Sequence, residues 1–322
     1  MKCDVICIGE LLIDFTPLYS ADDQKYVYEA NPGGAPANVA VQLSRLGVKS
    51  GFVGKVGNDH FGRYLKGTLD SYSVCTAGLV LDNDFPTTLA FVHLDSQGDR
   101  SFTFYRKPGA DTQLTYEDID LSLLDNCRIL HFGSLSFTDE PAKTAVLQVL
   151  EYAKTRNKII SYDPNWRAPL WKTKECGIAG MKLGLNFCDI IKVSDEELIM
   201  LTDCTDITEG INKLLNIGIK IVLVTLGPNG CYAANRKGIE YLNTYDVKAV
   251  DTTGSGDSFL GAFLYNVLQS QVALDQISIR QLADFADFSN AAGALCAAKR
   301  GSIPSMPDLS EIQCFRKNVP KK

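Results

Sequence analysis

The chain lacks the two commonest nucleotide-binding fingerprints. Neither the phosphate loop G-x-x-x-x-G-K-[ST] nor the dinucleotide motif G-x-G-x-x-G occurs anywhere in the sequence. The missing dinucleotide motif argues against an oxidoreductase, because that motif would follow the first strand of a nicotinamide-binding fold. Any nucleotide chemistry must therefore use another scaffold.

The marks of several other protein classes are missing too. No run of 18 apolar residues occurs, and the apolar stretch at residues 3–9 is too short for a secretory signal and contains Asp4. The ten cysteines include no Cys-x-x-Cys pair, which favours reduced thiols over zinc ligands or disulfides. A net charge of −6 without a basic stripe argues against a nucleic-acid partner. We expect a cytoplasmic protein that binds neither nucleic acid nor membrane.

What the sequence does contain is a regular alternation of short apolar runs and helical patterns. The run at residues 5–8 is near-continuously apolar, as in a strand that is buried on both faces, and the other runs are mostly apolar. Their alternation with helices predicts βα units, an α/β fold and a mostly parallel sheet. The predicted strands are residues 5–8, 52–56, 129–132, 159–162, 190–193 and 221–224, and the predicted helices include residues 36–46, 61–69, 141–155, 208–216, 258–265 and 285–298.

Two segments depart from this pattern. Residues 12–31 and 86–106 alternate polar and apolar side chains, and the second segment reads as a hairpin around residues 96–99. Strands with this period have one face in water. We therefore predict a small β-sheet lid within a single domain of residues 1–322, able to exclude water from a reacting group. The exposed lid also predicts a homodimer that forms through it.

The most informative motif opens the helix predicted near residue 258. Residues 251–257 read Asp-Thr-Thr-Gly-Ser-Gly-Asp. The glycines let several backbone N–H groups point at one spot, and the helix dipole adds positive charge there, which suits a phosphate or a developing oxyanion. Asp257 would repel a bound phosphate, so it makes chemical sense as a base that deprotonates an attacking hydroxyl. The alternative is an acid that only caps its own helix.

A second glycine motif lies near the N-terminus. Gly33 and Gly34 precede the helix predicted at residues 36–46, where they would let a ligand approach the backbone, and Asn38 offers an amide from the first turn. The alternative is a plain glycine loop. Asp14 follows the first strand, at the carboxyl end where open α/β sheets bind ligands.

Five segments, in order along nearly the whole chain, together resemble the ribokinase/PfkB family of carbohydrate kinases. Residues 33–38 and 251–257 resemble its two signatures, and residues 104–111, 161–167 and 301–304 resemble its fructokinase branch, of the bacterial type. The resemblance implies a ribokinase-like three-layer α/β/α fold with a β-lid. It also implies an ATP-dependent sugar kinase that converts D-fructose to D-fructose 6-phosphate. A related kinase for 2-keto-3-deoxygluconate, aminoimidazole riboside or ribose stays open, as does an inactive kinase-like sugar sensor.

The resemblance also implies roles for individual residues, and it implies ATP, Mg²⁺ and K⁺ as cofactors. Asp257 is expected to be the general base, and the backbone of Gly254, Ser255 and Gly256 the anion hole. The residues expected to bind the sugar are Asp14, Gly33, Gly34, Asn38, Phe104, Arg106 and Arg167. Those expected to bind the nucleotide are Ser194, which replaces the family's usual Asn, Thr225, Gly227, Gly230 and Asn290. Glu197 is expected to act on Mg²⁺ through water, and Asp251, Thr253, Gly301 and Ser305 to hold the monovalent cation.

Overall fold

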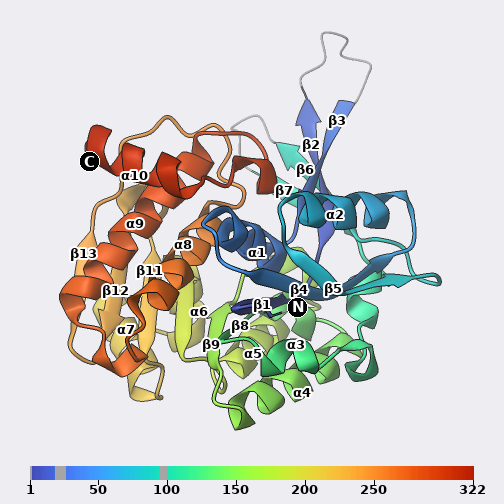
Figure 1. The fold of residues 1–322 in the computed structure, drawn as a ribbon, viewed down its shortest axis with the longest axis horizontal. Coiled ribbons are helices and arrows are strands. Elements are labelled where there is room, and N and C mark those ends of the chain that lie inside the picture. The colour runs from blue at the N-terminus through green and yellow to red at the C-terminus, as the bar shows by residue number, and fades with distance from the viewer. Residues whose placement is uncertain (1, 19–26, 95–99) are drawn as a thin grey trace.

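The structure, a computed structural model, describes residues 2–18, 27–94 and 100–322 and contains a large sheet with helices on both faces (Figure 1). Within the described residues, nine strands form this sheet in the order β13-β12-β11-β10-β9-β8-β1-β4-β5. The strands from β5 to β11 in this order are parallel to one another, whereas the pairs β11–β12 and β12–β13 are antiparallel. The strands are β1 (Val5–Ile8), β4 (Ser50–Gly57), β5 (Cys75–Asp82), β8 (Ile129–Gly133), β9 (Ile159–Asp163), β10 (Ile190–Ser194), β11 (Ile221–Thr225), β12 (Cys231–Asn235) and β13 (Gly238–Leu242).

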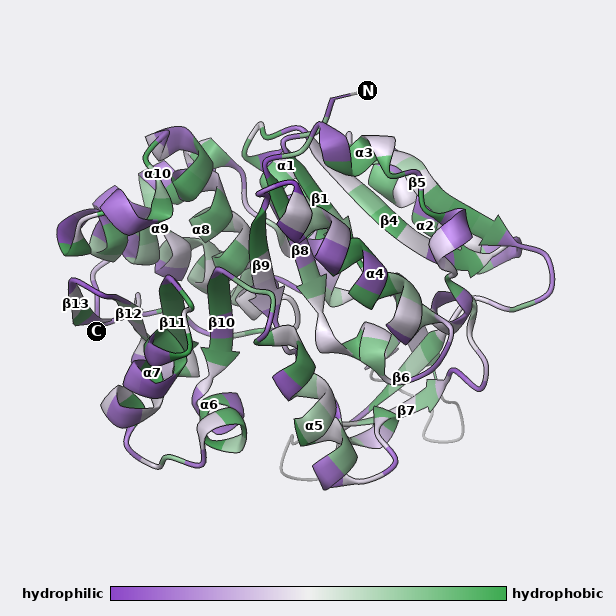
Figure 2. Ribbon diagram, turned by 90° about the horizontal axis from the view of Figure 1, so that it is seen from below, coloured by the Kyte–Doolittle hydropathy of each residue, from purple (hydrophilic) through white to green (hydrophobic). Residues whose placement is uncertain are grey.

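Two layers of helices explain why the central strands are mostly apolar. One face of the sheet packs on α1 (Ala35–Arg45), α2 (His60–Ser71), α8 (Ser255–Ser270) and α9 (Ile279–Ala297). The other face packs on α3 (Ser122–Asp125), α4 (Ala142–Thr155), α5 (Lys174–Gly184), α6 (Asp195–Thr202) and α7 (Ile207–Asn216), and α10 (Leu309–Asn318) lies against α9 (Figure 2). A side chain on either face of a central strand is therefore removed from water. The six predicted strands and the predicted helices are confirmed, with ends that differ by a few residues.

A second, smaller sheet confirms the separate small sheet predicted from residues 12–31 and 86–106. It has the order β3-β2-β6-β7 and consists of β2 (Leu12–Leu18), β3 (Val27–Gly33), β6 (Leu89–Leu94) and β7 (Arg100–Tyr105). The β2–β3 and β6–β7 pairs are antiparallel, and the central β2–β6 pair is parallel. The predicted turn at residues 96–99 lies outside the described residues, as do residues 19–26.

The fold brings distant parts of the chain to one edge of the main sheet. Parallel strands end at the same edge, so the residues that follow β1, β9, β10 and β11 gather there. The small sheet begins directly after β1, and α1 and α8 both start at this edge. Among the described residues, no helix is long and apolar enough to cross a membrane.

Candidate active site

The N-terminus of α8 has the backbone geometry of an anion site. Gly254 is the N-cap in a left-handed conformation, with φ 79°, and its carbonyl accepts from the Ser258 N–H at 2.8 Å. The Ser255 N–H donates to the carbonyl of Thr252 at 3.2 Å. The N–H groups of Gly256 and Asp257 lie in the first turn, where no earlier helical carbonyl can accept them. The N–H groups of Gly256 and Asp257 are therefore available to an anion, and the predicted anion hole of Gly254, Ser255 and Gly256 stays a prediction.

Asp257 is buried at this helix start and held in one orientation. Asn38 of α1 donates from Nδ2 to Oδ2 of Asp257 at 2.8 Å. Burial raises the pKa of Asp257 to about 6, and the nearby Asp163 adds to the rise, whereas Asn38 and Lys192 lower it. A carboxylate with such a pKa is ionised at neutral pH and is a better proton acceptor than an exposed aspartate. The two glycine motifs of the sequence thus meet at a side chain that can act as a base.

A buried ion pair that the sequence reasoning missed lies beside Asp257. Lys192 of β10 donates from Nζ to Oδ2 of Asp163, the last residue of β9, at 2.9 Å. Burial opposes the charge on Lys192, but Asp163, Glu197 and Asp257 together raise its pKa. A Cβ on Gly256 would lie 2.7 Å from Lys192 Nζ, so the ammonium group sits directly at the start of α8. The pair joins two neighbouring strands, so no contiguous motif in the sequence points to it.

A cavity of about 530 Å³, here called the first cavity, opens next to Asp257. Asp14 lines it, and burial raises the pKa of Asp14 to about 7, although Arg167 opposes the rise. Gly33 lies against it, since a Cβ there would lie 2.2 Å from Oδ2 of Asp14 and would push that carboxylate aside. The predicted sugar-binding residues on its wall are Asp14, Gly34, Asn38, Phe104 and Arg167, and the wall also includes Glu10, Leu12, Phe102, Leu135, Asn165 and Lys192, which were not predicted.

Arg106, like Gly33, is a predicted sugar-binding residue that does not line the first cavity. Its buried guanidinium donates to Asp111 Oδ2 at 2.7 Å, to Thr138 Oγ1 at 2.6 Å and to the Leu135 carbonyl at 3.0 Å. It lines a neighbouring cavity of about 450 Å³ that also touches Phe104. The guanidinium therefore ties the end of β7 to the loop after β8, a contact that sequence spacing does not reveal.

A second cavity, of about 440 Å³, lies on the other side of the α8 start and shares Ser194, Thr252 and Gly256 with the first. Its wall includes all five residues predicted to bind a nucleotide, which are Ser194, Thr225, Gly227, Gly230 and Asn290. Apolar side chains such as Val247, Ala294 and Ala297 complete the wall, as a flat aromatic base requires. The two cavities thus meet at the N-terminus of α8.

Ser194 and Glu197 form a capping box at the start of α6. The Ser194 hydroxyl accepts from the Glu197 N–H at 3.1 Å, and Glu197 Oε2 accepts from the Ser194 N–H at 2.8 Å. Glu197 Oε1 accepts from the Trp166 N–H at 2.7 Å. Each carboxylate oxygen keeps a second lone pair, so Glu197 still fits a water-mediated role toward a cation. The serine in place of Asn thus serves as a helix cap that also borders both cavities.

The four residues predicted to hold a monovalent cation come from two segments, residues 251–253 and 301–305, that converge beside the α8 start. Asp251 accepts from the Thr253 N–H at 2.9 Å and from the Gly301 N–H at 3.2 Å. Ser305 is buried and donates to the Ser302 carbonyl at 2.7 Å. Carboxylate, hydroxyl and carbonyl oxygens are the ligands of a hard cation. Within the described part of the chain, no group of three or more His, Cys, Asp or Glu side chains could hold a metal.

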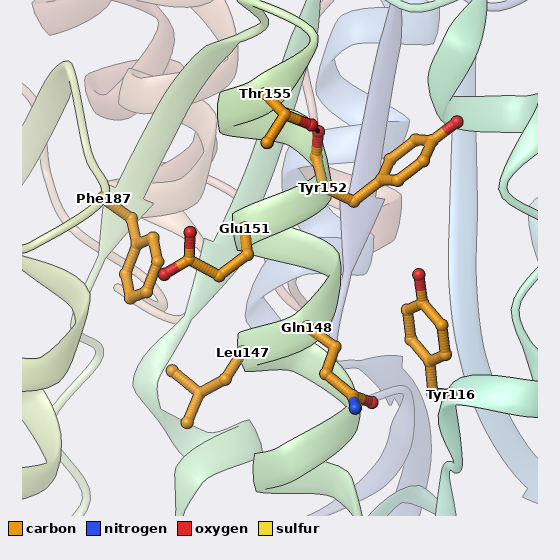
Figure 3. A pocket seen from close by; sticks show the side chains of 7 residues that line it. All are labelled: Tyr116, Leu147, Gln148, Glu151, Tyr152, Thr155 and Phe187. Atoms are coloured by element: carbon orange, nitrogen blue, oxygen red, sulfur yellow. Dashed lines mark hydrogen bonds between the residues drawn. The ribbon is translucent and has the colours of Figure 1, made fainter.

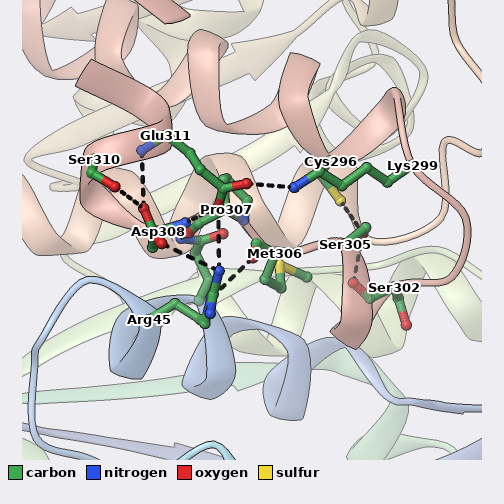
Figure 4. Close-up of polar contacts among 11 residues, drawn as sticks. Arg45, Cys296, Lys299, Ser302, Ser305, Met306, Pro307, Asp308, Ser310 and Glu311 are labelled. Carbon is green, nitrogen blue, oxygen red and sulfur yellow. Dashed lines mark hydrogen bonds and ion pairs between the residues drawn. The ribbon is translucent and has the colours of Figure 1, made fainter. Parts of the chain in front are cut away.

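Polar contacts with α1 fix the segment that contains Gly301 and Ser305 (Figure 4). Arg45, at the end of α1, donates to the Met306 carbonyl at 3.2 Å and pairs with Glu311 at 3.2 Å. Lys299 pairs with the other oxygen of Glu311 at 2.7 Å. The segment therefore keeps its place relative to α1, which also supplies Asn38.

Comparison with known proteins agrees with this geometry. Residues 2–309 match the model of the pfkB family carbohydrate kinases. Fructokinase-2 of Solanum lycopersicum is 41% identical, over 95% of this chain and 94% of that protein. The crystal structure of the fructokinase of Xylella fastidiosa with bound ATP has a TM-score of 0.91 and 32% identity, over 98% of this chain and 99% of that one. The fructokinase of Vibrio cholerae O395 with fructose, ADP and calcium has a TM-score of 0.87 and 34% identity, over 97% and 98%.

The fold and the convergent site define a sugar-kinase scaffold of the ribokinase-like class. The chain belongs to the pfkB family of carbohydrate kinases.

Proposed function

We propose that this kinase transfers the γ-phosphate of ATP to D-fructose and releases D-fructose 6-phosphate and ADP. The observation that carries the proposal is the placement of Asp257, which lies in the first turn of α8 between two adjoining cavities and is oriented by Asn38 at 2.8 Å. One cavity is polar enough for a sugar, and the other has the apolar wall that a nucleotide base needs. The names of the similar proteins, which act on fructose, favour this sugar over the others that the family phosphorylates.

In this proposal Asp257 takes the proton of the attacking hydroxyl. The hydroxyl oxygen forms a bond to the γ-phosphorus, and the bond from that phosphorus to the β–γ bridging oxygen breaks, so that ADP leaves with the bond's electron pair. The N–H groups of Gly256 and Asp257 and the ammonium of Lys192 would stabilise the negative charge on the transferred group. Arg167, which lines the first cavity, would contact the ligands, whereas Arg106 would act indirectly, through the contacts that tie the end of β7 to the loop after β8.

The cations would have separate places in this site. Mg²⁺ would neutralise the phosphates of ATP, with Glu197 holding its water shell. K⁺ would order the loop before α8, held by Asp251, Thr253, Gly301 and Ser305. The donor sets fit these ions because they consist of oxygens, and the Ser255 hydroxyl at the same loop is buried without a hydrogen-bond partner.

We further infer that residues 1–322 act as one domain in which the small sheet serves as a lid. Phe102 and Phe104 of β7 line the first cavity, so movement of this sheet would open or close it. The opposite face carries Phe15 stacked on Phe91 at 4.7 Å and the 64% exposed Tyr105, which favours a homodimer through the lid. The ten free cysteines favour a reducing compartment such as the cytoplasm.

The test is an ADP-release assay with Mg-ATP and potassium against fructose, ribose, glucose, 2-keto-3-deoxygluconate and aminoimidazole riboside. The proposal expects the highest kcat/KM for fructose. A higher kcat/KM for another sugar would support the kinase assignment and identify that sugar, instead of fructose, as the substrate. No release with any sugar would favour the inactive sensor.

A further inference from the structure

Glu10 lines the first cavity and has one carboxylate oxygen that is buried without a hydrogen-bond partner. It follows β1, and its side chain is buried, with the residue 4% exposed. Oε1 accepts from the Ala35 N–H at the start of α1 at 2.9 Å, whereas Oε2 is buried and has no hydrogen-bond partner. A buried acceptor without a partner is unfavourable by more than an ordinary hydrogen bond contributes. Such an atom therefore calls for an explanation, and a ligand hydroxyl in the cavity provides one.

Asn165 presents the complementary group to the same cavity. It lies after β9 in a left-handed backbone conformation, with φ 51°, and its N–H donates to Asp163 Oδ1 at 3.3 Å. Its Nδ2 is buried without a hydrogen-bond partner. The backbone is thus bent into a conformation that most residues avoid, and the bend carries an unused donor to the cavity wall.

The two unpaired atoms suit a polyhydroxylated ligand. A sugar hydroxyl donates one hydrogen bond and accepts others, so it can satisfy both a carboxylate oxygen and an amide nitrogen. Phosphate oxygens would be repelled by the Glu10 carboxylate, which favours an uncharged ligand with hydroxyl groups beside it. Neither residue is the proposed base, Asp257, and neither is part of the anion site at the start of α8.

We propose that Glu10 and Asn165 are sugar-binding residues, with Glu10 Oε2 accepting a hydrogen bond from one sugar hydroxyl and Asn165 Nδ2 donating to a sugar oxygen. The inference rests on the proposed sugar-kinase function and deepens it. It assigns part of the sugar specificity to two residues that lie outside the glycine signatures of the sequence.

The decisive variant is Glu10→Gln. The amide oxygen can still accept from the Ala35 N–H, so the contact that supports α1 is kept, while an NH₂ donor replaces the Oε2 acceptor. Asn165→Gly removes the amide and suits the left-handed backbone. Glu151→Gln is the matched control, because Glu151 lies in the open concavity on the outer side of α4 (Figure 3). Thermal unfolding confirms that each variant folds.

The assay measures KM and kcat for the sugar that the wild-type enzyme phosphorylates fastest, and for its singly deoxygenated derivatives. We expect Glu10→Gln and Asn165→Gly each to raise KM about tenfold or more with kcat within about threefold, and Glu151→Gln to change neither. For one deoxy derivative, the wild-type enzyme and Glu10→Gln should show equal KM, because the hydroxyl that Glu10 binds is missing.

An unchanged KM in folded Glu10→Gln would overturn the inference. A KM penalty of equal size for the parent sugar and every deoxy derivative would also overturn it, because that result indicates a purely structural role. A wild-type enzyme that prefers another sugar would refute the fructose proposal alone, since the same comparison then decides the role of Glu10 with that sugar.

Discussion

Replacement of Asp257 by Asn should lower the activity of the enzyme and raise its stability. The amide cannot accept the proton of the attacking hydroxyl, and the loss of a positioned general base lowers turnover by about 10²–10⁴-fold. Sugar binding should be largely kept, because the oxygen of the amide can still accept from Asn38. Turnover at the wild-type level would refute the assignment of Asp257 as the base.

The same variant should be more stable than the wild type at neutral pH. Burial raises the pKa of Asp257 from 3.8 to about 6, so the folded protein binds more protons than the unfolded chain between these values. Stability therefore falls as pH rises through this window, by up to about 3 kcal/mol for this group. Asn carries no charge, so it should raise the unfolding free energy by up to that amount at pH 7, with no gain near pH 4. Urea unfolding of the wild type and the variant at pH 7 and at pH 4 measures both differences in free energy.

The pH dependence of the wild-type enzyme supplies the matching kinetic test. With a pKa of about 6, the ionised fraction of Asp257 falls about tenfold between pH 7 and pH 5, and kcat/KM should fall with it. An ordinary aspartate would lose less than about a tenth of its ionised form over that range. Asp275→Asn, at an exposed position outside both cavities, is the control. A flat profile from pH 7 to pH 5 would contradict the raised pKa.

Three further outcomes follow from the same geometry. Gly33→Ala would bring a Cβ within 2.2 Å of Asp14 Oδ2, so KM for the sugar should rise about tenfold or more in a protein that still folds, and an unchanged KM would argue against Asp14 as a sugar ligand. Lys192→Met leaves Asp163 buried without its partner, which should destabilise the protein by about 3–5 kcal/mol in urea unfolding. An unchanged unfolding midpoint would show that the pair is dispensable. Replacement of potassium by tetramethylammonium should lower kcat, and an equal rate in both salts would refute the proposed potassium site.

The sequence predicts the main elements of the fold because their signals are local. The mostly apolar runs of β1, β8, β9, β10 and β11 identify buried strands without reference to any partner. The strand β5 and the hairpin of β12 and β13 escaped prediction. Their residues mix polar and apolar side chains, since these strands lie toward the edges of the sheet, where burial is less complete.

The candidate site was predictable where a motif is contiguous and hidden where it depends on pairing. Gly254, Asp257 and Asn38 could be singled out because glycines and a helix start lie next to them in the sequence. The ion pair of Lys192 with Asp163 joins two different strands, and neither residue has a local signature. Their partnership follows only from the parallel register of the sheet.

Arg106 and Glu10 show that the sequence does not reveal which polar groups remain available to a ligand. Arg106 stands in a segment that resembles the family, but its donors are used by Asp111, Thr138 and Leu135. Glu10 has no motif of its own, yet it lines the first cavity and has an unpaired buried oxygen. Which side chain keeps an unused hydrogen-bonding group is a property of the packed structure.

The most direct test of the account identifies the phosphorylated product. The enzyme is incubated with fructose, Mg-ATP and potassium, and fructose 6-phosphate is measured with phosphoglucose isomerase and glucose-6-phosphate dehydrogenase alongside ADP. The account predicts equal amounts of fructose 6-phosphate and ADP from the wild type, and neither above background from Asp257→Asn. ADP without fructose 6-phosphate, or equal product from the two proteins, would contradict it.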